Sequence, residues 1–265
     1  MPIATLAETD LYYRFDGDDG AGETVFFANS LASDLGMWDA QIPALVDAGF
    51  RTLRYDMRGH GRSSSPPGPY CIEQLAGDAL GLLDHLGLEQ VHLCGLSLGG
   101  MVAQWLAASN RPRLKSASLC TTAAYLDPPG VWDQRIAAVK NGGMETVVQS
   151  TIERWFTAHG LESLCAEIAS IRAAILRTSA NGYAGCCAAI ADMDQRESIK
   201  AVDLPVMVLV GEQDPTTTLA HAREIHASIN ASRLIVIGQA QHFVNVEKSA
   251  DFNRALLDFL GSIAH

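Results

Sequence analysis

The 265-residue chain is expected to adopt an α/β fold, in which a mostly parallel sheet is flanked by helices and carries an inserted helical cap. Two observations predict this class. Short apolar runs of strand length alternate with longer runs of helical periodicity, as in a parallel sheet covered on both faces. This alternation stops between residues 127 and 200, where helical segments follow one another without a convincing strand. The sequence therefore predicts one core, residues 1–126 and 201–265, and a cap at residues 127–200.

The expected elements follow the chain in order. Residues 11–15 alternate as a strand does and precede a turn at 16–20, which favours an antiparallel hairpin or meander at the start. Further strands are expected at 25–28, 51–55, 91–94, 115–120, 204–210 and 234–237. Core helices are expected at 38–46, 72–86, 101–108 and 249–263, and cap helices at 136–139, 146–156, 162–177 and 183–191. Pro128-Pro129-Gly130 opens the cap, and Asp203-Leu204-Pro205 returns the chain to the sheet.

Composition excludes several classes of partner. The net charge is −11 and the isoelectric point is near 5.1, so neither nucleic acid nor an anionic membrane is an expected partner. No apolar run has the roughly 18 residues of a membrane span, and no secretory signal is evident. The six cysteines show neither disulfide-framework nor zinc spacing, and Cys94 and Cys120 lie in apolar strand-like runs. A reducing cytoplasm is therefore the expected location.

The run Gly95-Leu96-Ser97-Leu98-Gly99 is the most informative motif. It reads G-x-S-x-G and lies between an expected strand and an expected helix, which is the setting of a nucleophile elbow. A sharp strand-to-helix turn holds the serine in a strained conformation, and a β-carbon two residues to either side would crowd that turn. Backbone N–H groups at the helix start then face developing negative charge. The motif predicts acyl transfer through a covalent intermediate on Ser97.

A serine hydroxyl needs a base, and the base needs an orienting acid. With this type of elbow the acid and then the histidine follow the serine along the chain, each after a late strand. Asp214 lies in the turn after the strand at 204–210, and His242 in the loop after the last strand. Glu212 is the local rival for the acid, but its position at the strand exit more often faces away from a site. We therefore predict a triad of Ser97, Asp214 and His242.

The expected oxyanion hole uses two backbone N–H groups. One belongs to Leu98, directly after the nucleophile, and the other to Leu31 in the loop after the first parallel strand. His60, in the run Arg58-Gly59-His60-Gly61, has the chemistry of a catalytic histidine. It precedes the serine in the chain, however, so a structural role in its loop is favoured.

Over its whole length the chain resembles the α/β-hydrolase superfamily and, more narrowly, the 3-oxoadipate enol-lactonase family. The narrower resemblance rests on these segments: Asn29-Ser30-Leu31 with residues 34–39; residues 54–61; residues 66–70; Cys94-Gly95-Leu96-Ser97-Leu98-Gly99-Gly100-Met101; and the cap segments at 135–139, 153–156 and 182–187. Two positions depart from the pattern. Ala32 and Gln241 stand where glycine is expected, and Ala32 changes the backbone freedom of the oxyanion loop.

The resemblance implies an eight-stranded sheet and hydrolysis of a small anionic enol-lactone to 3-oxoadipate in aromatic catabolism, without metal or cofactor. The carboxylate of such a substrate needs a cation or hydrogen-bond donors. Arg135 and Arg154 are the candidate cations in the cap, with Trp132, Trp155 and Tyr183 as walls or donors. Arg154 has the alternative of a solvated helix face, and Trp155 has the alternative of simple core packing. The oligomeric state is not encoded visibly.

Three other functions fit the same residues. A general carboxylesterase or perhydrolase would use the same triad on neutral esters, and a C–C hydrolase would use it on a vinylogous diketone. A ligand receptor with a hydrolase fold belongs to a different class, and the complete triad counts against it.

Overall fold

The computed structural model describes residues 2–18, 22–127 and 130–263. Asp19 and Gly20 of the expected turn, and Pro128 and Pro129 at the start of the expected cap, lie outside these residues. The strands are β1 (Ile3–Thr5), β2 (Asp10–Asp16), β3 (Thr24–Ala28), β4 (Arg51–Tyr55), β5 (Val91–Leu96), β6 (Leu114–Cys120), β7 (Val206–Gly211) and β8 (Ser232–Ile237). They form one eight-stranded sheet in the order β1-β2-β4-β3-β5-β6-β7-β8.

The helices account for the rest of the regular structure. Those that precede β6 or follow β7 are η1 (Leu35–Trp38), α1 (Ile42–Asp47), α2 (Ile72–His85), α3 (Leu98–Ser109), η2 (Arg111–Arg113), α9 (Leu219–Ser228), α10 (Val244–Glu247) and α11 (Ser249–Gly261). Those between β6 and β7 are α4 (Gly130–Gly142), α5 (Glu145–Trp155), α6 (Ala158–Ser163), α7 (Cys165–Arg177), α8 (Ala180–Asp192) and η3 (Ser198–Ala201).

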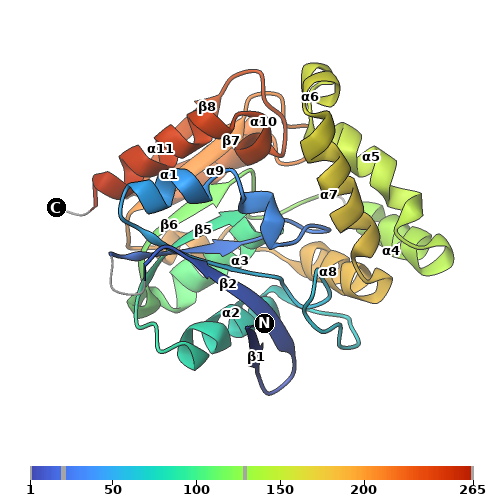
Figure 1. Cartoon of the computed structure of the whole chain (residues 1–265), viewed down its shortest axis with the longest axis horizontal. Helices are drawn as coiled ribbons and strands as arrows, with labels where there is room; N and C mark the ends of the chain where they lie inside the picture. Colours follow the sequence, from blue (N-terminus) through green and yellow to red (C-terminus); the bar gives the residue numbers. More distant parts are fainter. Residues whose placement is uncertain (1, 19–21, 128–129, 264–265) are drawn as a thin grey trace.

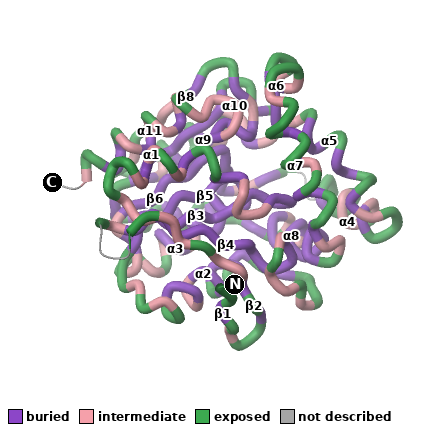
Figure 2. The backbone as a smooth tube through the Cα atoms, in the orientation of Figure 1, coloured by how far each residue is buried: buried purple, intermediate pink, exposed green. Residues whose placement is uncertain are grey.

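The sheet is mostly parallel, as predicted. β1 pairs antiparallel with β2, and β2 pairs antiparallel with β4, while every pair from β4 through β3, β5, β6 and β7 to β8 is parallel. Every residue of β3, β5 and β7 is buried, because helices cover both faces: α2 and α3 pack together on one, and α1 and α11 on the other (Figures 1 and 2). The α/β fold expected from the sequence is confirmed.

The helices α4 to α8 gather on one side of the molecule, beyond the end of the sheet (Figure 1). Helix α8 is joined to the loop after β4 through glycine: Gly59 and Gly182 lie so close that a β-carbon on either would collide with the Cα of the other. Tyr70 also donates its backbone N–H to the carbonyl of Gly185, at 3.2 Å. Among the described residues no helix has both the length and the apolar character needed to cross a membrane.

Several expected boundaries are wrong for local reasons. The helix expected at 38–46 is instead η1 followed by α1, because the Trp38 indole donates to Asn29 Oδ1 at 2.9 Å and Pro43 stands in the first turn of α1. The helix expected at 162–177 is divided into α6 and α7 at Leu164. The helix expected at 136–139 belongs to the longer α4. The strand expected from Leu204 begins only after Pro205, whose nitrogen cannot donate to a neighbouring strand.

Candidate active site

Ser97 occupies the turn between β5 and α3, and its backbone has φ 58° and ψ −115°. A β-carbon on Gly95 would collide with the carbonyl of Gly99, and one on Gly99 with the carbonyl of Ala28. These contacts confirm that the turn requires small residues two positions before and after the serine. The backbone of Ser97 is fixed on both sides, since its N–H donates to Cys120 O at 2.9 Å and its carbonyl accepts from Thr122 Oγ1 at 2.8 Å. The surrounding structure thus maintains a conformation that a serine rarely adopts.

The structure brings Asp214 and His242 together at the ends of β7 and β8. His242 Nδ1 lies 2.7 Å from Asp214 Oδ2, and both side chains are buried. Thr217 Oγ1 donates to the same oxygen at 2.7 Å, while the amides of Thr216 and Thr217 donate to Asp214 Oδ1 at 2.8 and 3.1 Å. Burial by itself would raise the pKa of Asp214. The charge of His242 and these hydrogen bonds outweigh burial, so the pKa lies below its ordinary value.

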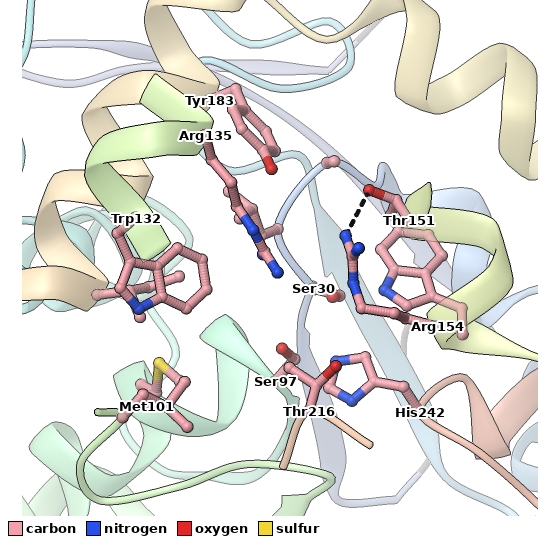
Figure 3. Close-up of a pocket in the computed structure, with 15 residues that line it drawn as sticks. Ser30, Ser97, Met101, Trp132, Arg135, Thr151, Arg154, Tyr183, Thr216 and His242 are labelled. Carbon is pink, nitrogen blue, oxygen red and sulfur yellow. Dashed lines mark hydrogen bonds between the residues drawn. The ribbon is translucent and has the colours of Figure 1, made fainter. Parts of the chain in front are cut away.

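Ser97 and His242 lie at the floor of a cavity beneath helices α4, α5 and α8 (Figure 3). The Nδ1 atom of His242 is engaged by Asp214, so Nε2 is the ring nitrogen left for the serine. The cavity is lined by Ser30, Leu31, Ala32, Ser97, Met101, Leu126, Trp132, Arg135, Thr151, Arg154, Trp155, Tyr183, Ile190, Thr216 and His242. The structure thus brings the three expected triad residues together at one end of this cavity.

The two expected oxyanion donors lie in the loop after β3 and at the start of α3. Leu31 lines the cavity, and Leu98 is the first residue of α3, where backbone N–H groups have no partner within the helix. In the described part of the chain neither amide donates to a protein acceptor. Both N–H groups are therefore available to a bound oxyanion.

All four expected substrate-binding residues line the cavity, and so does Arg154. The Arg135 guanidinium lies 4.6 Å from the centre of the Trp132 ring, and Arg154 donates to Thr151 Oγ1 at 3.2 Å. Both guanidinium groups extend into the space above Ser97 (Figure 3). No Asp or Glu is among the described residues that line it. Burial, and then the charge of Arg135, lower the pKa of Arg154. The lining of the cavity thus carries two positive side chains and suits an anion.

The aromatic walls are fixed by packing. Trp155 stacks on Phe243, the residue after His242, with ring centres 3.9 Å apart and planes 9° apart. The Phe243 amide donates to the Trp155 carbonyl at 3.0 Å. Tyr183 is almost fully buried, and burial raises the pKa of its hydroxyl, so this group is a neutral donor. Helix α5 is therefore joined directly to the loop that carries the base.

Glu212 and His60 do not take part in this cluster. Glu212 is exposed and its Oε2 accepts the Gln239 amide at 3.3 Å. His60 is buried in its own loop, where Nδ1 faces the Arg58 carbonyl at 3.1 Å and Nε2 accepts the Ala32 amide at 2.9 Å.

Sequence reasoning missed Thr216 and Thr217 around the acid, and Met101, Thr151 and Ile190 in the cavity wall. The run Asp214-Pro215-Thr216-Thr217 carries a signal for the first pair, because an aspartate followed by Ser or Thr typically accepts local amides. The wall residues come from separate elements and carry no local signal. Among the described residues, no group of three or more His, Cys, Asp or Glu side chains could hold a metal ion.

Comparison with known proteins places the chain in a family. Residues 23–249 match the family model described as the alpha/beta hydrolase fold. The chain is 38% identical to 3-oxoadipate enol-lactonase 2 of Acinetobacter baylyi, over 88% of this chain and 86% of that protein. It is 32% identical to 3-oxoadipate enol-lactonase 1 of the same organism, over 96% and 94%. The crystal structure of the enol-lactonase from Burkholderia xenovorans LB400 is 39% identical, with a TM-score of 0.96 over 98% of this chain and 100% of that one. The chain therefore belongs to the alpha/beta hydrolase fold family, in which these enol-lactonases are its relatives.

Proposed function

We propose that the protein is a serine hydrolase that opens 3-oxoadipate enol-lactone to 3-oxoadipate during the breakdown of aromatic compounds. One observation carries the substrate assignment: Arg135 and Arg154 direct two positive charges into the cavity above Ser97, and no described carboxylate in its lining neutralises them. A neutral ester needs no such charge, whereas a lactone with an acetate arm does. The names of the relatives, 3-oxoadipate enol-lactonases, support the same choice.

In the first half of the reaction, Ser97 Oγ bonds to the lactone carbonyl carbon while His242 Nε2 takes its proton. Asp214, 2.7 Å from His242 Nδ1, stabilises the imidazolium that forms. The carbonyl oxygen becomes negative and accepts the N–H groups of Leu31 and Leu98. The ring C–O bond then breaks, the enolate oxygen takes the proton from His242 Nε2, and the released enol tautomerises to a ketone. The opened chain stays attached to Ser97 as an ester.

In the second half, His242 takes a proton from water, and the resulting hydroxide bonds to the same carbonyl carbon. The ester bond breaks and the proton returns to Ser97 Oγ. The product then carries two carboxylates, of which one is the original side arm. Arg135 and Arg154 hold that side arm, with Trp132, Trp155 and Tyr183 shaping the space around it.

We also propose that residues 127–200 act as a cap on a core of residues 1–126 and 201–265. The arginines and aromatic residues of the site come from helices α4, α5 and α8, whereas the triad comes from the strand ends. In this proposal the cap selects the substrate, and the core carries out the reaction. A cytoplasmic location fits the six free thiols, of which Cys94, Cys120, Cys186 and Cys187 are buried.

The deciding experiment is ultraviolet-monitored hydrolysis of 3-oxoadipate enol-lactone beside p-nitrophenyl acetate, with Ser97→Ala as control. Fast lactone opening, slow ester turnover and loss of both in the variant are expected. Good ester turnover without lactone opening would support a serine hydrolase but contradict 3-oxoadipate enol-lactone as its substrate. Unchanged activity of Ser97→Ala would reject the mechanism.

A further inference from the structure

The loop that carries the Leu31 amide is a tight turn with an unusual residue in it. Ser33 donates its N–H to the carbonyl of Ser30 at 3.3 Å, which closes a four-residue turn. Ala32, the third residue of that turn, has φ 62°, while Leu31 does not have a positive φ. This is the pattern of a type II turn, whose third position favours glycine because a β-carbon is crowded there. The turn therefore holds Ala32 in a conformation that alanine disfavours.

His60 provides the contact that holds Ala32. The Ala32 amide donates to His60 Nε2 at 2.9 Å, so Nε2 carries no proton and Nδ1 donates to the Arg58 carbonyl at 3.1 Å. Burial lowers the pKa of His60, with the Arg58 carbonyl and the charge of Asp34 acting in the opposite direction. The buried ring is thus neutral and presents a fixed acceptor to the turn.

The peptide group between Ser30 and Leu31 and the one between Leu31 and Ala32 are each held by hydrogen bonds. The preceding plane is held through the Ser30 carbonyl, which accepts Ser33 Oγ at 2.7 Å as well as the Ser33 amide. In a trans peptide the N–H points opposite to the carbonyl, so this also directs the Leu31 N–H. The following plane is held by His60 through the Ala32 N–H. Without that bond, the plane is free to rotate towards the turn type that alanine prefers.

The loop that carries His60 is itself anchored independently of Ala32. Asp56 Oδ2 accepts the Arg62 amide at 2.9 Å within that loop, and Asp56 Oδ1 accepts the Leu35 amide at 2.7 Å. The contact between Gly59 and Gly182 fixes the same loop against α8. The position of His60 Nε2 is therefore fixed by its own loop, and the hydrogen bond from the Ala32 amide holds the turn relative to that position.

We propose that His60 is a positioning residue for the oxyanion hole: by fixing the Ala32 peptide it holds the shape of the turn whose preceding peptide carries the Leu31 N–H, and so keeps that N–H in place for the oxygen of the transition state. The inference rests on the proposed acyl transfer by Ser97. A donor aimed at the transition state affects kcat whatever the acyl group, while a substrate anchor affects KM for the anionic lactone. His60 is thus expected to influence kcat on the lactone and on a neutral ester alike.

The test compares His60→Phe with His60→Gln. Phenylalanine keeps the ring but removes the acceptor, and glutamine offers a polar group near the position of Nε2. His60→Phe is expected to lower kcat about 10-fold or more on both the lactone and p-nitrophenyl acetate, with KM within about twofold. His60→Gln is expected to recover most of that loss. The control is His92→Phe, because His92 is also buried and hydrogen-bonded, to Ser116 Oγ at 2.8 Å, but lies at the opposite end of β5 from Ser97.

A double-mutant cycle with Ala32→Gly distinguishes a positioning role of His60 from a general loss of stability. Glycine adopts a positive φ without cost, so the turn needs His60 less, and the kcat loss from His60→Phe should shrink in the Ala32→Gly background. An equal loss in both backgrounds, or a His60→Phe enzyme with unchanged kcat, would overturn the inference. The proposed function fails separately, because it requires Ser97→Ala to be inactive.

Discussion

The guanidinium groups of Arg135 and Arg154 face the same cavity, and the charge of Arg135 adds to burial in lowering the pKa of Arg154. Two like charges in one small cavity repel each other unless an anion lies between them. The empty site is therefore electrostatically unfavourable, and an anionic ligand relieves that repulsion. This relation leads to a direct test of which residue holds the substrate carboxylate.

Replacement of Arg135 or Arg154 by Met is expected to raise KM for the lactone about 10- to 100-fold, because a hydrogen bond between charged groups is lost. KM for p-nitrophenyl acetate should stay unchanged, since that ester has no carboxylate. Steady-state kinetics on both substrates measure the difference. Arg172→Met is the matched control, because Arg172 is on α7 and bonds Gln149 at the surface. Equal KM values for the Arg135 variant and the native enzyme would remove Arg135 as an anchor.

Asp214→Asn is expected to lower kcat about 10³- to 10⁴-fold, because an amide cannot orient and stabilise the imidazolium as the carboxylate does. Thr217→Val keeps the shape but removes the 2.7 Å hydrogen bond to Asp214 Oδ2, and a loss of about 10-fold in kcat is expected. Single-turnover kinetics on the lactone measure both. Thr146→Val, which removes a hydroxyl bonded to the Gly143 carbonyl at the start of α5, should leave the rate unchanged. A Thr217→Val enzyme as fast as the control would show that the amides of residues 216 and 217 suffice to hold the acid.

Replacement of Gly99 and of Gly77 by alanine should change the free energy of unfolding in opposite directions. At Gly99 the new methyl group would collide with the Ala28 carbonyl, so the free energy of unfolding should fall by about 3 kcal/mol or more. At Gly77, in the exposed face of α2, nothing lies within 4 Å of the added carbon. There the helix propensity of alanine should raise the free energy of unfolding by about 0.5–1 kcal/mol. Urea denaturation of both variants tests this, and destabilisation by Gly77→Ala would contradict it.

The stability of the protein should depend on pH through His60. Its pKa in the folded state is lowered, mainly by burial, so below pH ~6.5 the unfolded chain binds a proton that the folded chain does not. Stability from this group is complete above that pH and falls on acidification, by at most about 1.4 kcal/mol per pH unit. His60→Gln removes the titration. The difference in unfolding free energy between native protein and variant should therefore shrink from pH 7 to pH 5, and parallel curves would refute the assignment.

The sequence predicts where the three triad candidates lie, because each follows a strand whose apolar run is visible, while their chemical roles stay predictions. Ser97, Asp214 and His242 all lie at the carboxyl ends of parallel strands, which share one edge of the sheet. The departure at Ala32 is also visible in the sequence, since alanine replaces an expected glycine. Its partner His60 is 28 positions away, however, and only the folded structure shows that the two loops meet.

Boundaries set by distant contacts are harder to predict. Thr157 begins the short helix α6 by accepting the Gly160 amide, and Glu247, 90 residues later, accepts its hydroxyl at 2.6 Å. The sequence of residues 157–177 contains no signal for that contact. One helix is therefore expected at 162–177, where the structure has α6 and α7. The lining of the cavity is likewise a product of packing: Thr151 on α5 and Ile190 on α8 both line it, although 39 positions separate them in the sequence.

The two positive charges in the cavity also shape the end of the catalytic cycle. Hydrolysis of the lactone creates a second carboxylate at the carbon that Ser97 attacks, so the product is a dianion where the substrate was a monoanion. Arg135 and Arg154 attract that dianion more strongly than the substrate, while the remainder of a chain with net charge −11 repels it. We therefore expect these charges to slow departure of the product, and added salt to speed that departure.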